Sequence, residues 1–134
     1  MIYMKYLAVG IGGIIGSLLR FFVSNIHFGL SDEYLPLDTL IVNLLGSYLL
    51  GLLTGLYSRF PKLPSYIQLS IGTGLIGSFT TFSTFSNEMV QLMLDKLYMQ
   101  VFIYFIGSFI GGLGMAYIGF LIGSGGKWKK VMSE

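Results

Sequence analysis

The chain has 134 residues, of which 54% are hydrophobic and only 10% are charged, and its mean hydropathy is +0.76. This composition excludes a soluble globular domain and predicts one integral membrane domain, 1–134. A net charge of +2 gives no reason to expect nucleic-acid binding, and the lack of cysteine excludes disulfides, thiol chemistry and Cys-ligated metal.

Four long uncharged runs predict an all-α membrane protein with four transmembrane helices. Each run is close to the roughly 20 residues that a helix needs to cross a bilayer. The runs cover about residues 6–25, 39–58, 64–87 and 99–122. The connections between them are short, so the chain has no room for a soluble domain.

Glycines recur at four-residue spacing in three of these runs. Small residues at this spacing let membrane helices approach closely, which predicts a compact bundle. The pairs are Gly12 and Gly16, Gly51 and Gly55, Gly107 and Gly111, and Gly119 and Gly123. Because four short helices are few to enclose a path across a bilayer, we expect the chain to oligomerise.

Polar residues interrupt the first two runs. Arg20, near the end of the first run, either extends its long side chain to the membrane interface or forms an electropositive funnel for anions. Asn43, in the second run, must find partners, because an amide in hydrocarbon is costly without them. It either joins helices or donates hydrogen bonds to a permeating anion, and the sequence leaves both open.

The third run contains the most unusual segment, residues 74–88. Six hydroxyl side chains are interleaved there with three phenylalanines, and they are Ser78, Thr80, Thr81, Ser83, Thr84 and Ser86. Serine and threonine compete with the backbone for hydrogen bonds, so the helix is weakest here. Irregular backbone at membrane depth persists only where it is buried in protein or lines a watery path. This segment is therefore the first place to expect function.

The phenylalanines of this segment, Phe79, Phe82 and Phe85, recur every three residues on one side of a helix. Core packing is the ordinary explanation of such a stripe. The alternative rests on the ring quadrupole, whose hydrogen-bearing edge attracts anions. Ring edges and hydroxyl donors together would bind an anion weakly enough to let it pass. Where the helix opens, freed carbonyl oxygens could also hold a hard cation.

Further polar residues follow this segment. Glu88 ends it, either as an interfacial charge or as a group that titrates in a path for ions or protons. In the fourth run, Tyr104 and Ser108 are one turn apart and Gly112 lies a further turn along, so a short polar stripe is flanked by small residues. Ser108 either belongs to a path or bonds back to a carbonyl of its own helix.

No enzyme site is expected. The sequence has no cysteine, no paired carboxylates within a span, no histidine-rich metal motif and no Ser-His-acid set. Besides a channel, two functions remain as alternatives. One is a proton-coupled small four-helix exporter, for which Glu88 is the only candidate acid. The other is a non-transporting subunit of a membrane complex, which leaves the hydroxyl-rich segment unexplained.

Lysine and arginine are distributed unevenly between the two faces of the expected bundle. Four spans place both termini on one face. That face carries Lys5, Arg59, Lys62, Lys127, Lys129 and Lys130, whereas the opposite face carries Lys96 and Arg20 and the acids Asp32, Glu33, Asp38 and Asp95. The positive-inside rule then predicts a multi-pass protein of the cell membrane with both termini in the cytoplasm.

Three motifs together carry a resemblance. They are Gly12-Gly13-x-x-Gly16-x-x-x-Arg20, Thr39-x-x-x-Asn43-x-x-Gly46 and Gly77-Ser78-Phe79-Thr80-Thr81-Phe82-Ser83-Thr84-Phe85. In combination they resemble the fluoride channel family known as Fluc or CrcB. The resemblance covers nearly the whole chain in length and span order, and the Thr-Thr-Phe-Ser-Thr-Phe string is its most specific part.

The resemblance implies a fluoride-selective passive channel that exports cytoplasmic fluoride and reduces its toxicity. It implies an antiparallel dual-topology dimer with two pores, a third helix broken at mid-membrane, and a structural Na⁺ at the dimer centre held by the backbone carbonyls of Gly77 and Thr80. The other residues it implies are Phe82, Phe85, Asn43, Tyr104 and Ser108 in the pore, Arg20 in a vestibule, and Thr81, Ser83, Thr84 and Glu88 as further contacts.

The identity of the partner subunit follows from the charge distribution. An antiparallel homodimer requires one sequence to insert in both orientations, which calls for a near-balanced distribution of lysine and arginine. The distribution in this chain is far from balanced. The favoured hypothesis is therefore a heterodimer with an oppositely oriented paralogue, an arrangement that the family also uses, and a homodimer is the alternative.

Overall fold

The computed structural model describes residues 2–25 and 35–125, and the backbone of these residues forms helices and no strands. Three helices are long: α1 (Ile2–Asn25), α2 (Leu37–Arg59) and α6 (Tyr98–Ser124). Between α2 and α6 lie the α-helices α3 (Ser65–Leu69), α4 (Gly77–Phe79) and α5 (Phe82–Leu94) and the π-helix η1 (Ser70–Ile76). The prediction of an all-α fold is confirmed for the described residues.

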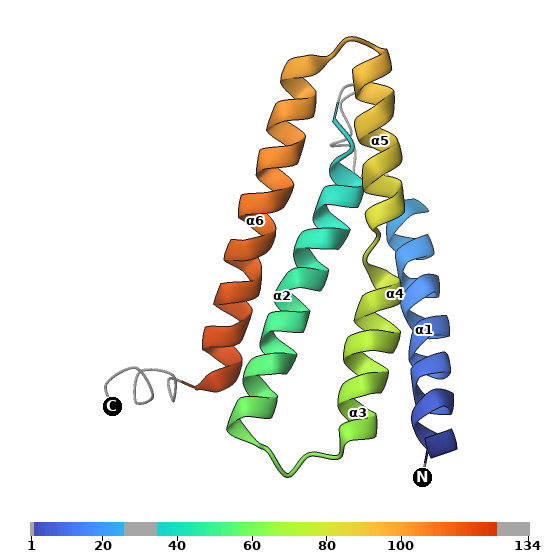
Figure 1. Cartoon of the computed structure of the whole chain (residues 1–134), viewed down its shortest axis with the longest axis vertical. Helices are drawn as coiled ribbons and strands as arrows, with labels where there is room; N and C mark the ends of the chain where they lie inside the picture. The colour runs from blue at the N-terminus through green and yellow to red at the C-terminus, as the bar shows by residue number, and fades with distance from the viewer. Residues whose placement is uncertain (1, 26–34, 126–134) are drawn as a thin grey trace.

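The helices lie along one long axis (Figure 1). We call residues 65–94 the broken segment; it and α1 run in one direction, and α2 and α6 run in the other. Ile2 and Gly125 therefore lie at the same end of the molecule. Residues of the charge argument that lie outside the described ranges are Asp32, Glu33, Lys127, Lys129 and Lys130.

The three long helices have the length and composition of membrane spans. Mean hydropathy is 1.8 for α1, 1.7 for α2 and 1.9 for α6. Large apolar side chains project from them without covering, among them Phe21 at 64% and Phe102 at 63% exposed. Such a surface is stable in lipid rather than in water, so the chain is a membrane protein.

Glycines bring α2 and α6 into backbone contact. A Cβ added at Gly51 would overlap the carbonyl oxygen of Ala116, and one added at Gly119 would overlap that of Tyr48. These glycines therefore have the packing role that their spacing predicts. Gly107 differs, because among the described residues nothing lies within 4 Å of its Cβ position, so that part of the chain gives it no packing contact.

The first half of the broken segment packs on α1 in the same way. Gly12 and Gly16 of α1 face the carbonyls of Ser70 and Leu75 in η1. The Ser70 hydroxyl also donates to the carbonyl of Ala8 at 2.6 Å. These contacts attach η1 firmly to α1.

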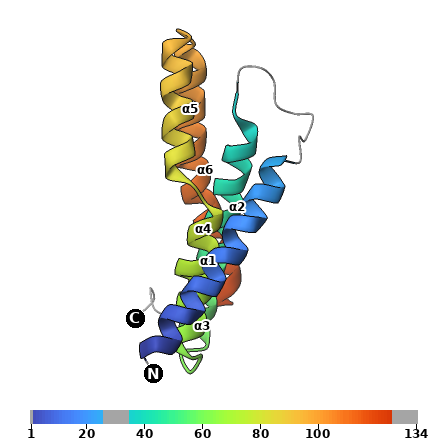
Figure 2. The ribbon, with the colours of Figure 1, turned by 90° about the vertical axis from the view of Figure 1, so that its right-hand side faces the viewer.

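The second half of the broken segment packs against a different helix. α5 packs mainly on α6. Figure 2 shows these two helices side by side, and at the end of the molecule away from the N-terminus they diverge from α1 and α2. The turn between them contains Lys96, whose φ of 60° is uncommon for a residue other than glycine. The broken segment thus packs on α1 through its first half and on α6 through its second half, and the break lies between these halves.

Candidate functional site

The broken segment leaves the helical conformation at Thr80 and Thr81. The Thr80 N–H still donates to the Ile76 carbonyl at 3.0 Å, but its ψ of 158° is extended. Thr81 is also extended, with φ −145° and ψ 122°, and its hydroxyl accepts the amide of Thr84 at 3.2 Å. Threonine suits this position because its hydroxyl satisfies an amide that the start of a helix leaves free.

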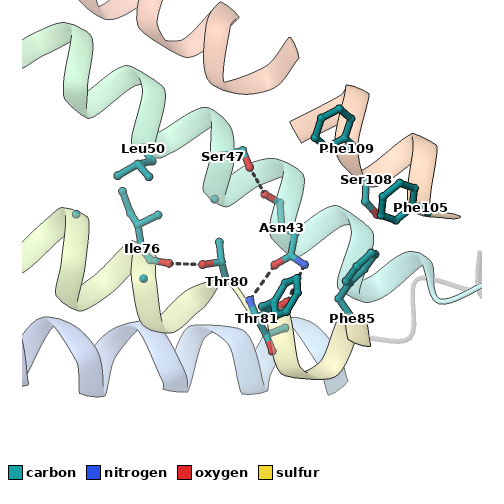
Figure 3. Close-up of a pocket in the computed structure, with 14 residues that line it drawn as sticks. Asn43, Ser47, Leu50, Ile76, Thr80, Thr81, Phe85, Phe105, Ser108 and Phe109 are labelled. Atoms are coloured by element: carbon teal, nitrogen blue, oxygen red, sulfur yellow. Dashed lines mark hydrogen bonds between the residues drawn. The ribbon is translucent and has the colours of Figure 1, made fainter. Parts of the chain in front are cut away.

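Asn43 of α2 binds both backbone polar groups of Thr81 (Figure 3). Its Oδ1 accepts the Thr81 N–H at 2.8 Å, and its Nδ2 donates to the Thr81 carbonyl at 2.9 Å. A primary amide offers the same donor and acceptor as a peptide group, so Asn43 replaces hydrogen bonds that the interrupted helix has lost. Asn43 thus joins α2 to the broken segment. The second hydrogen of its side-chain amide is left for another acceptor.

The break separates the carbonyls of residues 77–80 from the amides that they would bind in a continuous helix. In a continuous α-helix, the carbonyl of Gly77 would accept the N–H of Thr81, and that of Thr80 would accept the N–H of Thr84. The first of these N–H groups donates instead to Asn43, and the second donates to the Thr81 hydroxyl. The carbonyls of Gly77 and Thr80, which the resemblance assigns to a cation, are therefore among those that lose their helical donors at the break.

A cavity of about 410 Å³ opens beside the break, between α2, α6 and both halves of the broken segment (Figure 3). We call it the central cavity. The predicted site residues that line it are Asn43, Gly77, Thr80, Thr81, Phe82, Phe85 and Ser108. The rest of its lining is mostly apolar and includes Leu50, Ile76, Phe105 and Phe109. A mostly apolar wall with a few convergent polar groups is the usual form of a binding site.

Ser108 stands out among the hydroxyls of the central cavity. Those of Ser47, Thr80 and Thr81 each donate to a carbonyl or to another hydroxyl. Within residues 2–25 and 35–125, the Ser108 hydroxyl has no hydrogen-bond partner, so the alternative that it bonds back to its own helix is not met. Its proton is available to an acceptor that enters the cavity.

Glu88 of α5 accepts hydrogen bonds from two other helices. The Thr39 hydroxyl of α2 donates to Oε1 at 2.7 Å, and the Tyr104 hydroxyl of α6 donates to Oε2 at 2.7 Å. Tyr104 is only 2% exposed and Thr39 8%. The carboxylate thus joins α2, α5 and α6. Sequence reasoning missed Thr39 as a site residue, although its spacing of four from Asn43 places both on one face of α2.

The three phenylalanines of the broken segment lie in different surroundings. Phe79 is buried, with 7% of its surface exposed, whereas Phe82 is 79% exposed. The Phe85 ring lies between the other rings of the site, with its centroid 5.0 Å from that of Tyr104 and 6.0 Å from that of Phe82. Packing therefore explains Phe79, and it does not explain Phe82.

A second pocket, of about 420 Å³, lies on the other side of the break, and we call it the Arg20 pocket. It is lined by Ser17, Arg20, Phe21, Ser24, Thr39, Val42, Thr81 and Thr84. Arg20 is the charged side chain among these lining residues. Thr81 lines both this pocket and the central cavity, whereas Ser83 lines neither and contacts the Thr81 hydroxyl at 3.3 Å.

Comparison with known proteins places these features in a family. A family model described as CrcB-like protein, Camphor Resistance (CrcB), matches residues 7–120. The chain is 43% identical over 118 residues to the fluoride-specific ion channel FluC 1 of Bacillus cereus, covering 88% of this chain and 82% of that protein. It is 41% identical over 120 residues to fluoride-specific ion channel FluC 2 of Staphylococcus haemolyticus, covering 90% and 97%.

A third relative, the fluoride-specific ion channel FluC 2 of Moorella thermoacetica, is 43% identical over 118 residues, which cover 88% of this chain and 95% of that protein. All three relatives bear the names of ion channels, which agrees with the prediction that the chain is not an enzyme. The family model and the relatives each span most of the chain, including every residue of the two pockets. The chain belongs to the CrcB family.

Proposed function

We propose that the chain forms a fluoride-selective passive channel that lets fluoride leave the cytoplasm. The observation that carries the proposal is the break at Thr80 and Thr81, which opens a cavity beside Phe82, Phe85 and Ser108. The names of the relatives indicate the same ion. Hydrogen fluoride crosses membranes as a neutral acid and ionises inside the cell, so a selective leak for the anion is enough to reduce its toxicity.

The groups around the break suit a small anion that must lose its water. The ring edges of Phe82 and Phe85 carry partial positive charge. The hydroxyl of Ser108 and the remaining amide hydrogen of Asn43 supply donors. In this proposal Arg20 draws anions into the vestibule, and further contacts come from Tyr104, Thr81, Ser83, Thr84 and Glu88. Several weak binding groups in series favour throughput over retention.

The functional unit that we infer is an antiparallel dual-topology dimer with two pores. In it the broken segment crosses the membrane as the third of four spans. The central cavity is open to the surroundings of the single chain, and polar groups such as Ser108 line it. Within a bilayer such groups must be covered by protein or must line a watery path, and a second subunit would provide the cover.

The orientation of the chain follows from its charges. The end of the bundle that holds both Ile2 and Gly125 carries Lys5, Arg59 and Lys62, which supports insertion in the cell membrane with both termini in the cytoplasm. The described acids, Asp38 and Asp95 among them, lie toward the opposite end. Because this bias opposes insertion in both orientations, the partner that we favour is an oppositely oriented paralogue rather than a second copy.

A structural Na⁺ fits the donors at the break. The carbonyls of Gly77 and Thr80 have lost their helical amides to Asn43 and to the Thr81 hydroxyl, so each has lone pairs to offer. Backbone carbonyl oxygens are ligands that hard cations accept. When bound, the ion would supply positive charge that holds two subunits together through these carbonyls. The residues that would hold it are Gly77 and Thr80 from both subunits.

Replacing Na⁺ by choline at constant ionic strength is expected to weaken the dimer. A ligand that binds only the assembled state stabilises it by about 2.7 kcal/mol at a concentration of 100 times its Kd. The measurements are size-exclusion chromatography in detergent and the temperature of thermal unfolding. Equal elution and equal unfolding temperatures in Na⁺ and in choline would contradict the Na⁺ site and leave the channel proposal intact.

Fluoride efflux from liposomes tests the channel itself. Liposomes that contain the purified chain are expected to release fluoride rapidly, to retain chloride, and to do so without a proton gradient. If the chain alone gives no flux but conducts when it is purified with its paralogue, the heterodimer is supported. Strict dependence on a proton gradient would instead establish the exporter alternative. Absence of any flux in both preparations would favour the non-transporting subunit.

A further inference from the structure

Two stripes of residues at four-residue spacing face each other on α2 and α6. On α2 they are Thr39, Asn43 and Ser47, and on α6 they are Tyr104, Ser108 and Gly112. Residues four apart lie one above the other on a helix. The two helices run in the same direction, and their backbones are in contact at glycines, so the stripes form successive levels along one seam.

Each level pairs one residue of α2 with one of α6. At the first, Thr39 and Tyr104 are joined through the carboxylate of Glu88. At the second, Asn43 and Ser108 both line the central cavity. At the third, a Cβ added at Gly112 would lie 3.6 Å from Ser47 Oγ. The third level thus has a polar group on α2 alone, opposite a residue without a side chain.

We propose that Ser47 is a further fluoride-binding residue, which extends the path one helical turn beyond Asn43. The inference rests on the channel function proposed above. Ser47 lines the central cavity together with Asn43 and Ser108, and the next cavity residue along α2 is the apolar Leu50. Ser47 is therefore the last polar side chain of α2 in this direction within the cavity (Figure 3).

The Ser47 hydroxyl has a proton that it can redirect. It donates to the Asn43 carbonyl at 2.8 Å, a bond within its own helix to an oxygen that a continuous helix already pairs with an amide. Rotation of the hydroxyl toward the cavity leaves that carbonyl with its helical partner. Gly112 leaves the space in front of the hydroxyl open, since its Cβ position makes only ordinary van der Waals contact with it. An anion at this level would meet a donor from α2.

The test is a set of substitutions made in the preparation that conducts fluoride. Ser47→Ala is expected to lower the initial rate of fluoride efflux about fivefold, the factor for losing one hydrogen bond of ordinary strength. Adding Gly112→Ser to Ser47→Ala is expected to restore most of the rate, because it returns a hydroxyl to the same level from the opposite helix. Ser58→Ala is the matched control, since Ser58 donates to the Gly55 carbonyl at 2.7 Å within α2 and does not line the cavity.

Three results would overturn the assignment. They are unchanged efflux from Ser47→Ala, an equal loss in Ser58→Ala, or a loss in Ser47→Ala that Gly112→Ser does not restore, which would mark Ser47 as a packing residue. Unfolding temperatures measured for all variants separate lost conduction from lost folding. If Ser47 lines the path, the double variant regains its efflux rate while the unfolding temperatures of the variants stay the same. Lack of flux from the unsubstituted protein would overturn the channel proposal instead.

Discussion

Replacement of Asn43 by leucine is expected to abolish fluoride efflux and to destabilise the folded protein. Leucine has a similar volume but no donor or acceptor, so the N–H and carbonyl of Thr81 both lose their partner. A buried polar group left unpaired costs about 1–3 kcal/mol, and this substitution leaves two such groups unpaired. Since Thr81 also caps α5, its displacement moves Phe82 at the start of that helix. We expect efflux to fall at least about a hundredfold, which corresponds to about 2.7 kcal/mol.

The matched control for this substitution is Asn25→Ala. The Asn25 amide donates at 2.7 Å to the Phe21 carbonyl within its own helix and contacts no other segment through that bond. We expect wild-type efflux and an unchanged unfolding temperature from Asn25→Ala. Efflux rates come from the fluoride-loaded liposomes described above, and stability comes from thermal unfolding in detergent. Normal efflux from Asn43→Leu would contradict the view that this amide holds the break in its conducting shape.

The position of the break could be predicted from the sequence because its causes are local. The hydroxyls of residues 78–86 weaken one stretch of helix, and Thr81 caps an amide only three residues away. The long apolar runs are equally local signals. The run expected at 39–58 lies inside α2, and the run expected at 99–122 lies inside α6.

The partners of the site residues could not be predicted, because they depend on how each helix is rotated against the others. Glu88 binds Thr39 across 49 residues and Tyr104 across 16 residues of sequence. Periodicity shows that Thr39 and Asn43 share one face of α2, but it does not show which helix that face meets. The π-helix η1 was missed for a similar reason, since no local motif predicts it. In the structure, the backbone of η1 lies against the glycines of α1, and the sequence of η1 alone does not reveal this contact.

The two interpretations of the phenylalanine stripe make opposite predictions for Phe79 and Phe82. Phe79 is buried, so its ring contributes to packing within the chain, whereas Phe82 is 79% exposed and contributes little to it. The substitutions Phe79→Leu and Phe82→Leu each keep an apolar side chain and remove the aromatic ring. If the rings act through packing alone, Phe79→Leu is the more damaging change to every property. If ring edges bind the anion, the two substitutions separate stability from conduction.

We expect Phe82→Leu to lower fluoride efflux about thirtyfold at an unchanged unfolding temperature. The ring quadrupole is worth about 2 kcal/mol to a desolvated cation at the ring face, and an interaction of that size with an anion at the ring edge corresponds to about this factor. Phe79→Leu is the comparison, and it is expected to lower the unfolding temperature while efflux per folded protein stays within about threefold of the wild type. Phe82 lies in the central cavity next to Phe85, and Phe79 does not line it. Losses of efflux that follow the loss of stability in each variant would assign the whole stripe to packing and remove the rings from the fluoride path.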